Sequence, residues 1–349
     1  MIELTESDSF AIFRLPDDNL VYFIRQIIPN NIDFDSKISE RSGFIIFPFD
    51  NTRHKNIFIS ADEILINPNF KFTKEEETEI AATSEIEYNE ISSKFIAEVE
   101  KGNFQKIVHS KIKTIENPGI DVSRLFHKIA KSNKSVFVFL FNSPMTGTWL
   151  GATPEKFLTG YHNKFETTAL AGTQLIDLNE KEEWTAKEID EQAYVMDHIE
   201  HILNDLNIEY QKKGPYTRTA SQVENKKLIH IATDYQFKHS SGIEKLVLNL
   251  HPTPAVSGVP KIVAQDFIRG NEKHDRRYYS GFCGPVNVVD NEEINLFVTL
   301  RCMQIFKNKF LLYLGGGIVK GSQSGKEWVE TENKALMIEN AINSLVKKK

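Results

Sequence analysis

The chain has 349 residues, an apolar fraction of 40% and 24 phenylalanines, enough for a sizeable core, and its net charge of −6 disfavours a nucleic-acid partner. Its two cysteines, Cys283 and Cys302, imply no disulfide framework. The acidic, polar N-terminus and the short apolar runs predict neither a signal peptide nor a membrane span, so we expect a cytoplasmic protein without a membrane partner.

The predicted elements change in character along the chain. The first 95 residues read as short strands and loops, followed by a helix over residues 84–100. Strands then dominate, at Lys106–Ile115, Ser135–Phe141, Lys156–Tyr161, Phe165–Ala171, Lys245–Leu250, Ile294–Ile305 and Lys309–Leu314. Helices are predicted at Asp121–Ser132, Glu183–Leu206, Pro260–Arg269 and Glu327–Val346. Because strands and helices do not alternate regularly, the pattern favours one large α+β domain of mixed, mainly antiparallel sheets with flanking helices.

In two of these helices, one face is mostly apolar but starts with glutamates. Helical spacing aligns Glu188, Glu191, Val195, Ile199 and Ile202 in one helix, and Glu327, Glu330, Lys334, Met337, Ala341 and Leu345 in the other. Packing of the apolar part would carry the four glutamates inward, where a set of oxygen ligands suits a divalent cation, with Mg²⁺ as the leading candidate. The alternative is that the glutamates lie just outside the packed zone or pair with lysines.

Two residues have the chemistry of a base and an acid. Lys106 opens a strand, where most lysines are solvated, but a lysine buried near cations can lose its proton and serve as a general base. Glu155 ends a loop that begins at Trp149, and burial in a closed pocket would raise its pKa toward that of a useful acid.

Three further features have an ordinary interpretation, and two of them, Arg301 and the glycine run, have a functional one as well. Arg301 lies within an apolar predicted strand and is either an edge residue or a clamp for a ligand carboxylate. His230, in Leu228–Ala232, is by default a core histidine whose hydrogen bonds are satisfied. The glycine run Gly315–Gly317 follows a predicted strand, where it is either a plain turn or a place for a ligand to approach backbone N–H groups.

A series of sequence blocks over residues 100–340 carries a family resemblance. The blocks are KIVHSK (106–111), WLGATPEKFL (149–158), TALAGT (168–173), KEIDEQ (187–192), LIHIAT (228–233), LHPTPAVSGVPK (250–261), the spaced residues Glu272, Arg276, Tyr279 and Gly281, FVTLRC (297–302), GGGIVKGS (315–322) and EWVETENK (327–334). In kind and order they resemble the chorismate-utilising enzymes, which include the isochorismate, salicylate, anthranilate and aminodeoxychorismate synthases. Residues 1–95 match poorly and are expected to be a variable N-terminal part of the same domain, with residues 96–349 as the chorismate-binding catalytic part.

The resemblance implies roles for the matching residues. Lys106 would deprotonate water for attack at C2 of chorismate, Glu155 would protonate the departing 4-hydroxyl, and His230 would orient the ring. The substrate-binding residues would be Gly172, Thr173, Ala255, Tyr279, Arg301, Gly315, Gly317 and Lys334, with Tyr279 and Arg301 on the enolpyruvyl carboxylate. Glu191 and Glu330 match the main Mg²⁺ ligands, with Glu188 and Glu327 beside them.

Two positions sort the chain within the family. Lys106 matches the lysine of the water-using members, whereas Ala171 replaces the nucleophilic lysine of aminodeoxychorismate synthase, so no glutamine amidotransferase subunit is expected. We predict a monomeric, Mg²⁺-dependent isochorismate synthase, an isomerase whose product feeds menaquinone or siderophore synthesis. The alternatives are a salicylate synthase, which also eliminates pyruvate, and a non-catalytic binder of chorismate-like dianions. One departure is Gln192, where the family usually has a histidine.

Overall fold

Strands and helices account for most of the computed structural model, which describes residues 1–28, 37–223, 225–240 and 242–346. One set of strands comprises β2 (Ser9–Arg14), β3 (Tyr22–Gln26), β6 (Glu63–Ile66), β8 (Lys106–Glu116), β9 (Phe137–Ser143), β10 (Gly147–Thr153), β15 (Gly258–Val259), β18 (Cys302–Ile305) and β19 (Lys309–Val319). A second comprises β4 (Gly43–Phe47), β5 (Ile57–Ser60), β11 (Lys156–Tyr161), β12 (Lys164–Asp177), β13 (Tyr210–Val223), β14 (Lys226–Lys238), β16 (Phe282–Val286) and β17 (Glu293–Val298). The remaining elements are β1 (Ile2–Thr5), β7 (Phe70–Thr73), α1 (Glu85–Glu100), α2 (Val122–Ser132), α3 (Ala186–Asp205), α4 (Glu244–Leu250), α5 (Lys261–Asn271), α6 (Ser324–Val346) and a 3₁₀ turn, Ile38–Glu40.

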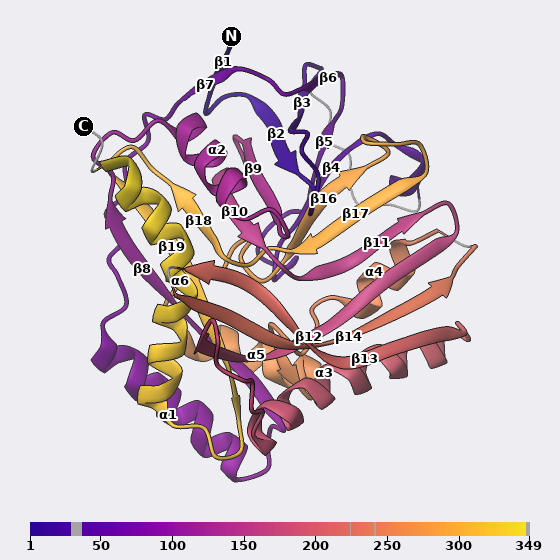
Figure 1. Ribbon diagram of the computed structural model, residues 1–349, viewed down its shortest axis with the longest axis vertical. Coiled ribbons are helices and arrows are strands. Elements are labelled where there is room, and N and C mark those ends of the chain that lie inside the picture. Colours follow the sequence, from indigo (N-terminus) through magenta and orange to yellow (C-terminus); the bar gives the residue numbers. More distant parts are fainter. Residues whose placement is uncertain (29–36, 224, 241, 347–349) are drawn as a thin grey trace.

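These strands form two large sheets (Figure 1). Over the described residues, the first sheet has the order β15-β8-β19-β18-β10-β9-β2-β3-β6 and the second the order β13-β14-β12-β11-β17-β16-β4-β5. Neighbouring strands in both sheets are antiparallel, and the separate pair β1–β7 is parallel. This confirms the predicted α+β fold of mainly antiparallel sheets. The first 95 residues supply strands to both sheets, because β2 pairs with β9 and β4 pairs with β16.

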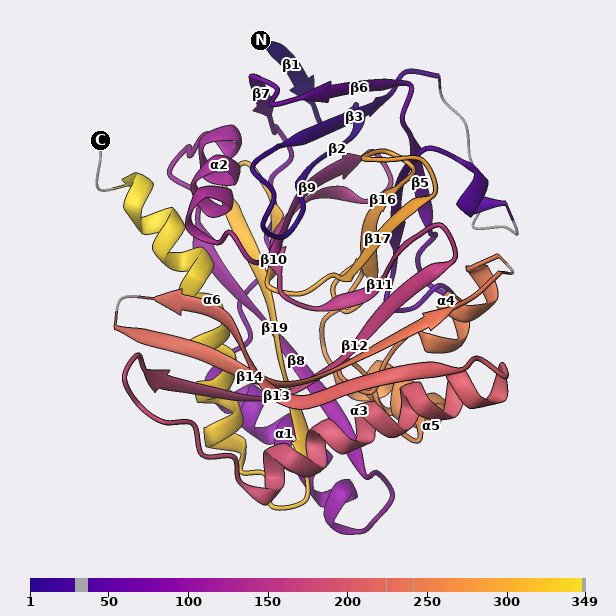
Figure 2. The same cartoon turned by 45° about the vertical axis from the view of Figure 1, so that its right-hand side comes forward.

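The apolar side chains fall into layers that follow from this arrangement. Aromatic residues such as Phe13, Phe137 and Trp149 fill the space between the two sheets. Helices α2 and α6 pack on the outer face of the first sheet, and α3 and α4 pack on the outer face of the second (Figure 2). The apolar stripe of α3 packs against the second sheet through Val195 and Ile199, so burial fixes the position of this helix beside that sheet.

The ends of several helices follow local sequence signals. Ser84 accepts a hydrogen bond from the Glu87 N–H at the start of α1, and Asp121 accepts from Ser123 and Arg124 at the start of α2. The predicted helices over 84–100, 121–132, 183–206, 260–269 and 327–346 are confirmed within a few residues at each end. None of the helices in the described ranges has the length and apolarity needed to cross a membrane.

Four local predictions were wrong. The segment Lys245–Leu250 is part of helix α4, where Leu246, Val247 and Leu250 are buried with helical spacing. The predicted loop from Trp149 is strand β10 as far as Thr153. The glycine run lies inside β19, which continues to Val319. The predicted strand Ile294–Ile305 is interrupted between β17 and β18, where Arg301 has a φ of +47° that an extended strand does not allow.

Candidate active site

The candidate site lies where strand β18 separates from β19. Their ladder ends at the pair Cys302–Tyr313, and beyond it the described pairing of β19 is with β8 alone. The carbonyl oxygen of Gly315 points away from β8, because it accepts a hydrogen bond of 2.9 Å from Lys334 Nζ. Since strand residues alternate in direction, Gly317 faces the same way. One edge of β19 therefore presents backbone groups to its surroundings over the glycine run.

Two of the three glycines of β19, Gly315 and Gly317, are required by what packs against them. A Cβ atom at Gly315 would lie 2.6 Å from the hydroxyl oxygen of Tyr279, and one at Gly317 would lie 2.2 Å from Glu191 Oε1. At Gly316 it would lie 3.4 Å from Glu327 Oε2 and 3.7 Å from Glu330 Oε1. The absence of side chains thus lets carboxylates from both acidic helices reach the same short stretch of backbone.

A cavity of about 60 Å³ lies beside this open edge. It brings together eleven of the predicted residues, namely Glu155, Gly172, Thr173, Glu191, His230, Ala255, Tyr279, Arg301, Gly315, Gly317 and Lys334. The remaining predicted residues, Lys106, Glu188, Glu327 and Glu330, are not among those that line the cavity.

The cavity wall also contains apolar residues that the sequence did not single out, such as Val108, Leu170 and Tyr313. An apolar residue in a strand has the same appearance in a single sequence whether it faces a core or a cavity. Their presence gives the site a largely apolar wall with a few polar groups, which is typical of small-molecule sites.

Lys106 is fully buried at the first residue of β8. Its Nζ lies 3.0 Å from Glu191 Oε1 in an ion pair, and it makes no well-directed hydrogen bond. Burial tends to raise the pKa of Glu191, but the charges of Lys106 and Lys334 outweigh this effect and hold the pKa below its usual value. Most lysines at the end of a strand are solvated, but Lys106 is not.

Glu155 lies between β10 and β11 and is 5% exposed. Burial raises the pKa of its carboxyl from 4.5 to about 8, although the charges of Lys106 and Lys334 oppose the change. At neutral pH the group is therefore mainly protonated and can act as a proton donor. The sequence predicted this behaviour for a closed pocket.

His230 and Arg301 form a fixed pair on the cavity wall. The Nδ1 atom of His230 lies 2.9 Å from the carbonyl oxygen of Gly172, so Nδ1 carries the proton and Nε2 accepts from Arg301 Nη2 at 3.2 Å. Burial, followed by the charge of Arg301, lowers the pKa of His230 well below its usual value, so the ring is neutral. Burial also lowers the pKa of Arg301 to about 10, and its guanidinium stays charged at neutral pH.

The acidic side chains of the two helices are held mainly by lysines. Glu330 Oε1 accepts from Lys334 Nζ at 2.7 Å, and Glu327 Oε1 accepts from Lys187 Nζ at 2.6 Å. Glu188 accepts from the backbone N–H of Thr185 at 2.9 Å and so caps α3. Within the described ranges, no three His, Cys, Asp or Glu side chains are already gathered as a cation's ligands. The lysine pairing that the sequence left as an alternative is thus present.

Nevertheless, the residues fit a hard divalent cation. Glu327 Oε2 is buried without a well-directed hydrogen bond, and it lies beside Gly316 together with Glu330 Oε1. Burial, and then the charge of Glu330, raises the pKa of Glu327 to about 7, which indicates that negative charge here is undercompensated. The donors are all oxygen, the type that Mg²⁺ prefers. Gln192, the departure noted above, donates to Thr233 Oγ1 at 2.9 Å and removes no carboxylate.

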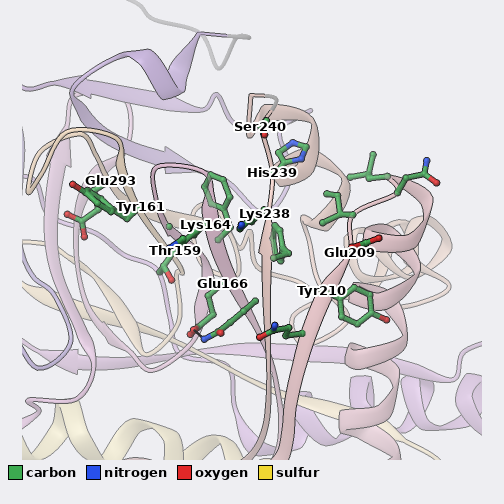
Figure 3. Close-up of a pocket in the computed structure, with 18 of the residues that line it drawn as sticks. Thr159, Tyr161, Lys164, Glu166, Glu209, Tyr210, Lys238, His239, Ser240 and Glu293 are labelled. Carbon is green, nitrogen blue, oxygen red and sulfur yellow. Dashed lines mark hydrogen bonds between the residues drawn. The ribbon is translucent and has the colours of Figure 1, made fainter.

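A second hollow, of about 1090 Å³, lies at the outer ends of β11, β12 and β14 (Figure 3). Its lining includes Thr159, Tyr161, Lys164, Glu166 and Lys238, together with residues that follow α3. It is open to solvent and contains none of the residues predicted to act on a substrate. Size alone therefore does not identify the functional site.

Comparison with known proteins gives concordant results. The family model described as chorismate binding enzyme matches residues 50–343. The isochorismate synthase MenF of Haemophilus influenzae is 27% identical over 249 residues, covering 69% of this chain and 56% of that protein. The isochorismate synthase EntC of Escherichia coli K12 is 29% identical over 237 residues, covering 65% and 59%.

The fold agrees with a solved structure as well. The menaquinone-specific isochorismate synthase MenF from Escherichia coli superposes with a TM-score of 0.78 at 16% identity, over 97% of this chain and 89% of that one. The sequence matches to the curated relatives span little more than half of the length of those proteins.

Proposed function

Because the chain belongs to the chorismate-binding enzyme family, we propose that it is an Mg²⁺-dependent isochorismate synthase of the cytoplasm, whose product feeds menaquinone or siderophore synthesis. The observation that carries the proposal is a buried, mainly protonated glutamic acid on the cavity wall, together with the buried Lys106, which is ion-paired with Glu191 of the same wall. After burial, the charge of Lys106 has the largest effect on the pKa of Glu155.

The proposed reaction uses these two groups in complementary roles. Lys106, acting as the neutral amine, takes a proton from water as the water oxygen bonds to C2 of chorismate, and Glu155 gives its proton to the 4-hydroxyl as the C4–O bond breaks. The ring double bonds shift between the two positions, and one water enters as another leaves. No net oxidation occurs, so the proposed reaction needs no redox cofactor.

The anionic groups of the substrate have matching cations in the site. Arg301, held by neutral His230, would bind the enolpyruvyl carboxylate together with the Tyr279 hydroxyl. Glu191 and Glu330, with Glu327 and Glu188 beside them, would hold Mg²⁺, which when bound would neutralise the ring carboxylate. Lys334, which contacts both Glu330 and the Gly315 carbonyl, would keep the wall of the cavity in place.

The proposal is tested by incubating the purified chain with chorismate and Mg²⁺ and identifying the products by chromatography. Isochorismate without pyruvate is the expected result. Salicylate and pyruvate formed by the chain alone would identify a salicylate synthase instead. Unchanged chorismate, with binding detected by calorimetry, would identify a non-catalytic binder.

A further inference from the structure

Tyr88 is a fully buried tyrosine of α1 to which the proposed reaction assigns no role. Its ring stacks on His109 with a centroid distance of 4.4 Å and an interplanar angle of 17°, and it meets the Trp328 ring edge-on at 5.4 Å. His109 is itself held through Nδ1 by Ser92 Oγ at 2.7 Å. The Tyr88 ring is therefore held by contacts with β8 and α6.

The phenol lies on the face of β19 that Glu327 also reaches. His109 of β8 is directly opposite Gly316 of β19, and opposite residues in an antiparallel ladder direct their side chains to the same face. On that face the Cβ position of Gly316 is 3.4 Å from Glu327 Oε2. The Trp328 ring against which Tyr88 packs belongs to the residue that follows Glu327.

Two complementary polar atoms in this place lack a well-directed hydrogen bond. The Tyr88 hydroxyl and Glu327 Oε2 are both buried, and beyond the weak interactions of the phenol with Ser92 and of the carboxylate with Ser322, neither makes a hydrogen bond. One is a donor and the other an acceptor, and an unsatisfied buried polar group is rare enough to need an explanation. Burial, followed by the charge of Glu327, raises the pKa of Tyr88 well above its usual value, against a smaller opposing effect of Ser92, so the phenol keeps its proton.

We propose that Tyr88 is a positioning residue for the cation site, whose phenol O–H donates to the Glu327 carboxylate when that carboxylate holds a divalent cation. The inference rests on the proposed function, because it assigns Glu327 to the cation. Partners that orient a ligand in this way typically change metal affinity by about 10- to 100-fold when they are removed. Through Tyr88, helix α1 would thus affect the affinity for the cation without contacting the substrate.

The test is calorimetric titration of the full chain with Mg²⁺ in the absence of chorismate. Tyr88→Phe keeps the stacked ring and should weaken Mg²⁺ binding by about 10-fold or more. Glu327→Gln should also weaken it, and the double variant should be no weaker than Glu327→Gln alone, because the two groups act together. A Tyr88→Phe affinity within about twofold of the parent, or fully additive losses, would overturn the proposal.

Tyr235→Phe is a matched control, because that tyrosine is also fully buried and donates to a carboxylate, Glu200, at 2.7 Å. Its Mg²⁺ affinity should equal that of the parent, and a loss as large as that of Tyr88→Phe would count against a specific role. If Tyr88→Phe does not fold, a crystal structure of the parent with Mn²⁺ provides the answer. A phenol oxygen within about 3.0 Å of Glu327 supports the proposal, and one beyond about 3.5 Å overturns it.

Chorismate turnover by the parent is measured separately. A chain whose Mg²⁺ affinity depends on Tyr88 but which leaves chorismate unchanged would refute the proposed function and keep this inference. A chain that makes isochorismate, with an unchanged affinity in Tyr88→Phe, would refute this inference alone.

Discussion

Glu155→Gln should make the stability of the chain less sensitive to pH. The carboxyl has its ordinary pKa of 4.5 in the unfolded chain and about 8 in the folded one. Between these values the folded state binds one more proton than the unfolded state, so the free energy of unfolding falls as pH rises, by about 1.4 kcal/mol per pH unit. This contribution is fully present below the unfolded pKa and is lost as pH rises through the folded pKa. Glutamine cannot ionise, so the variant lacks this loss.

The magnitude follows from the two pKa values. From about pH 5.5 to about pH 7.5 the parent should lose roughly 2.5 kcal/mol through Glu155, allowing for partial ionisation near the upper limit. The difference in unfolding free energy, variant minus parent, should increase by that amount. Urea denaturation at the two pH values measures it, and taking the difference cancels the groups that titrate equally in both proteins.

An exposed carboxyl provides the control. Glu182 is exposed, so Glu182→Gln replaces a group that is solvated in both states, and its difference from the parent should be the same at both pH values. If the Glu155→Gln difference were also constant with pH, the carboxyl would not be held protonated, and its assignment as the acid would lose its physical basis. Turnover of Glu155→Gln should fall by about 10²- to 10⁴-fold, as expected when a general acid is removed.

Three other substitutions test separate parts of the site. Lys106→Ala should reduce chorismate turnover by about 10²- to 10⁴-fold while circular dichroism shows an intact fold, and a rate equal to that of the parent would exclude Lys106 as the base. Glu330→Gln should raise the Mg²⁺ concentration needed for half-maximal activity by about 10-fold or more, and an unchanged titration would remove Glu330 from the ligand set. Gly317→Ala should abolish turnover, because its Cβ would lie 2.2 Å from Glu191 Oε1 and 3.1 Å from Lys106 Cε. Its control, Gly325→Ala, adds a Cβ with no atom within 4 Å and should be as active as the parent.

The sequence predicted most reliably those elements whose pattern extends over several turns. Helices α3 and α6 could be located because their apolar stripes are long and their acidic starts are unusual. Short apolar runs were less informative. Lys245–Leu250 has the composition of a buried strand, and six residues are too few to separate a period of 2 from one of 3.6.

The break at Arg301 could not be predicted from local sequence. The residues on both sides are apolar or β-branched and favour an extended strand, yet Arg301 has a φ of +47°. In this conformation the guanidinium of Arg301 reaches His230 Nε2 at 3.2 Å, and strained backbone of this kind persists only where the surrounding structure holds it. A residue that departs from local preference to reach a site is a recurrent feature of functional residues.

The sequence predicted which residues belong to the candidate site better than it predicted the contacts that they make. The motif order identified eleven of the residues that line the cavity, but spacing alone could not show which cation each glutamate meets. Lys187 is an example, because it lies on the same helix as Glu191 and yet pairs with Glu327 of α6. Tyr88 was also missed, since a tyrosine at helical spacing in α1 is indistinguishable from an ordinary core residue.

The unpaired side of β19 matters for solubility as well as for binding. A strand edge with free N–H and C=O groups is a template on which a strand from another molecule can add, and glycine offers no side chain to hinder it. Helices α3 and α6 cover this side and place negative charge over it. Truncation of the C-terminal helix would therefore expose an edge prone to intermolecular pairing, and the same two helices would protect the chain from aggregation while they build its binding surface.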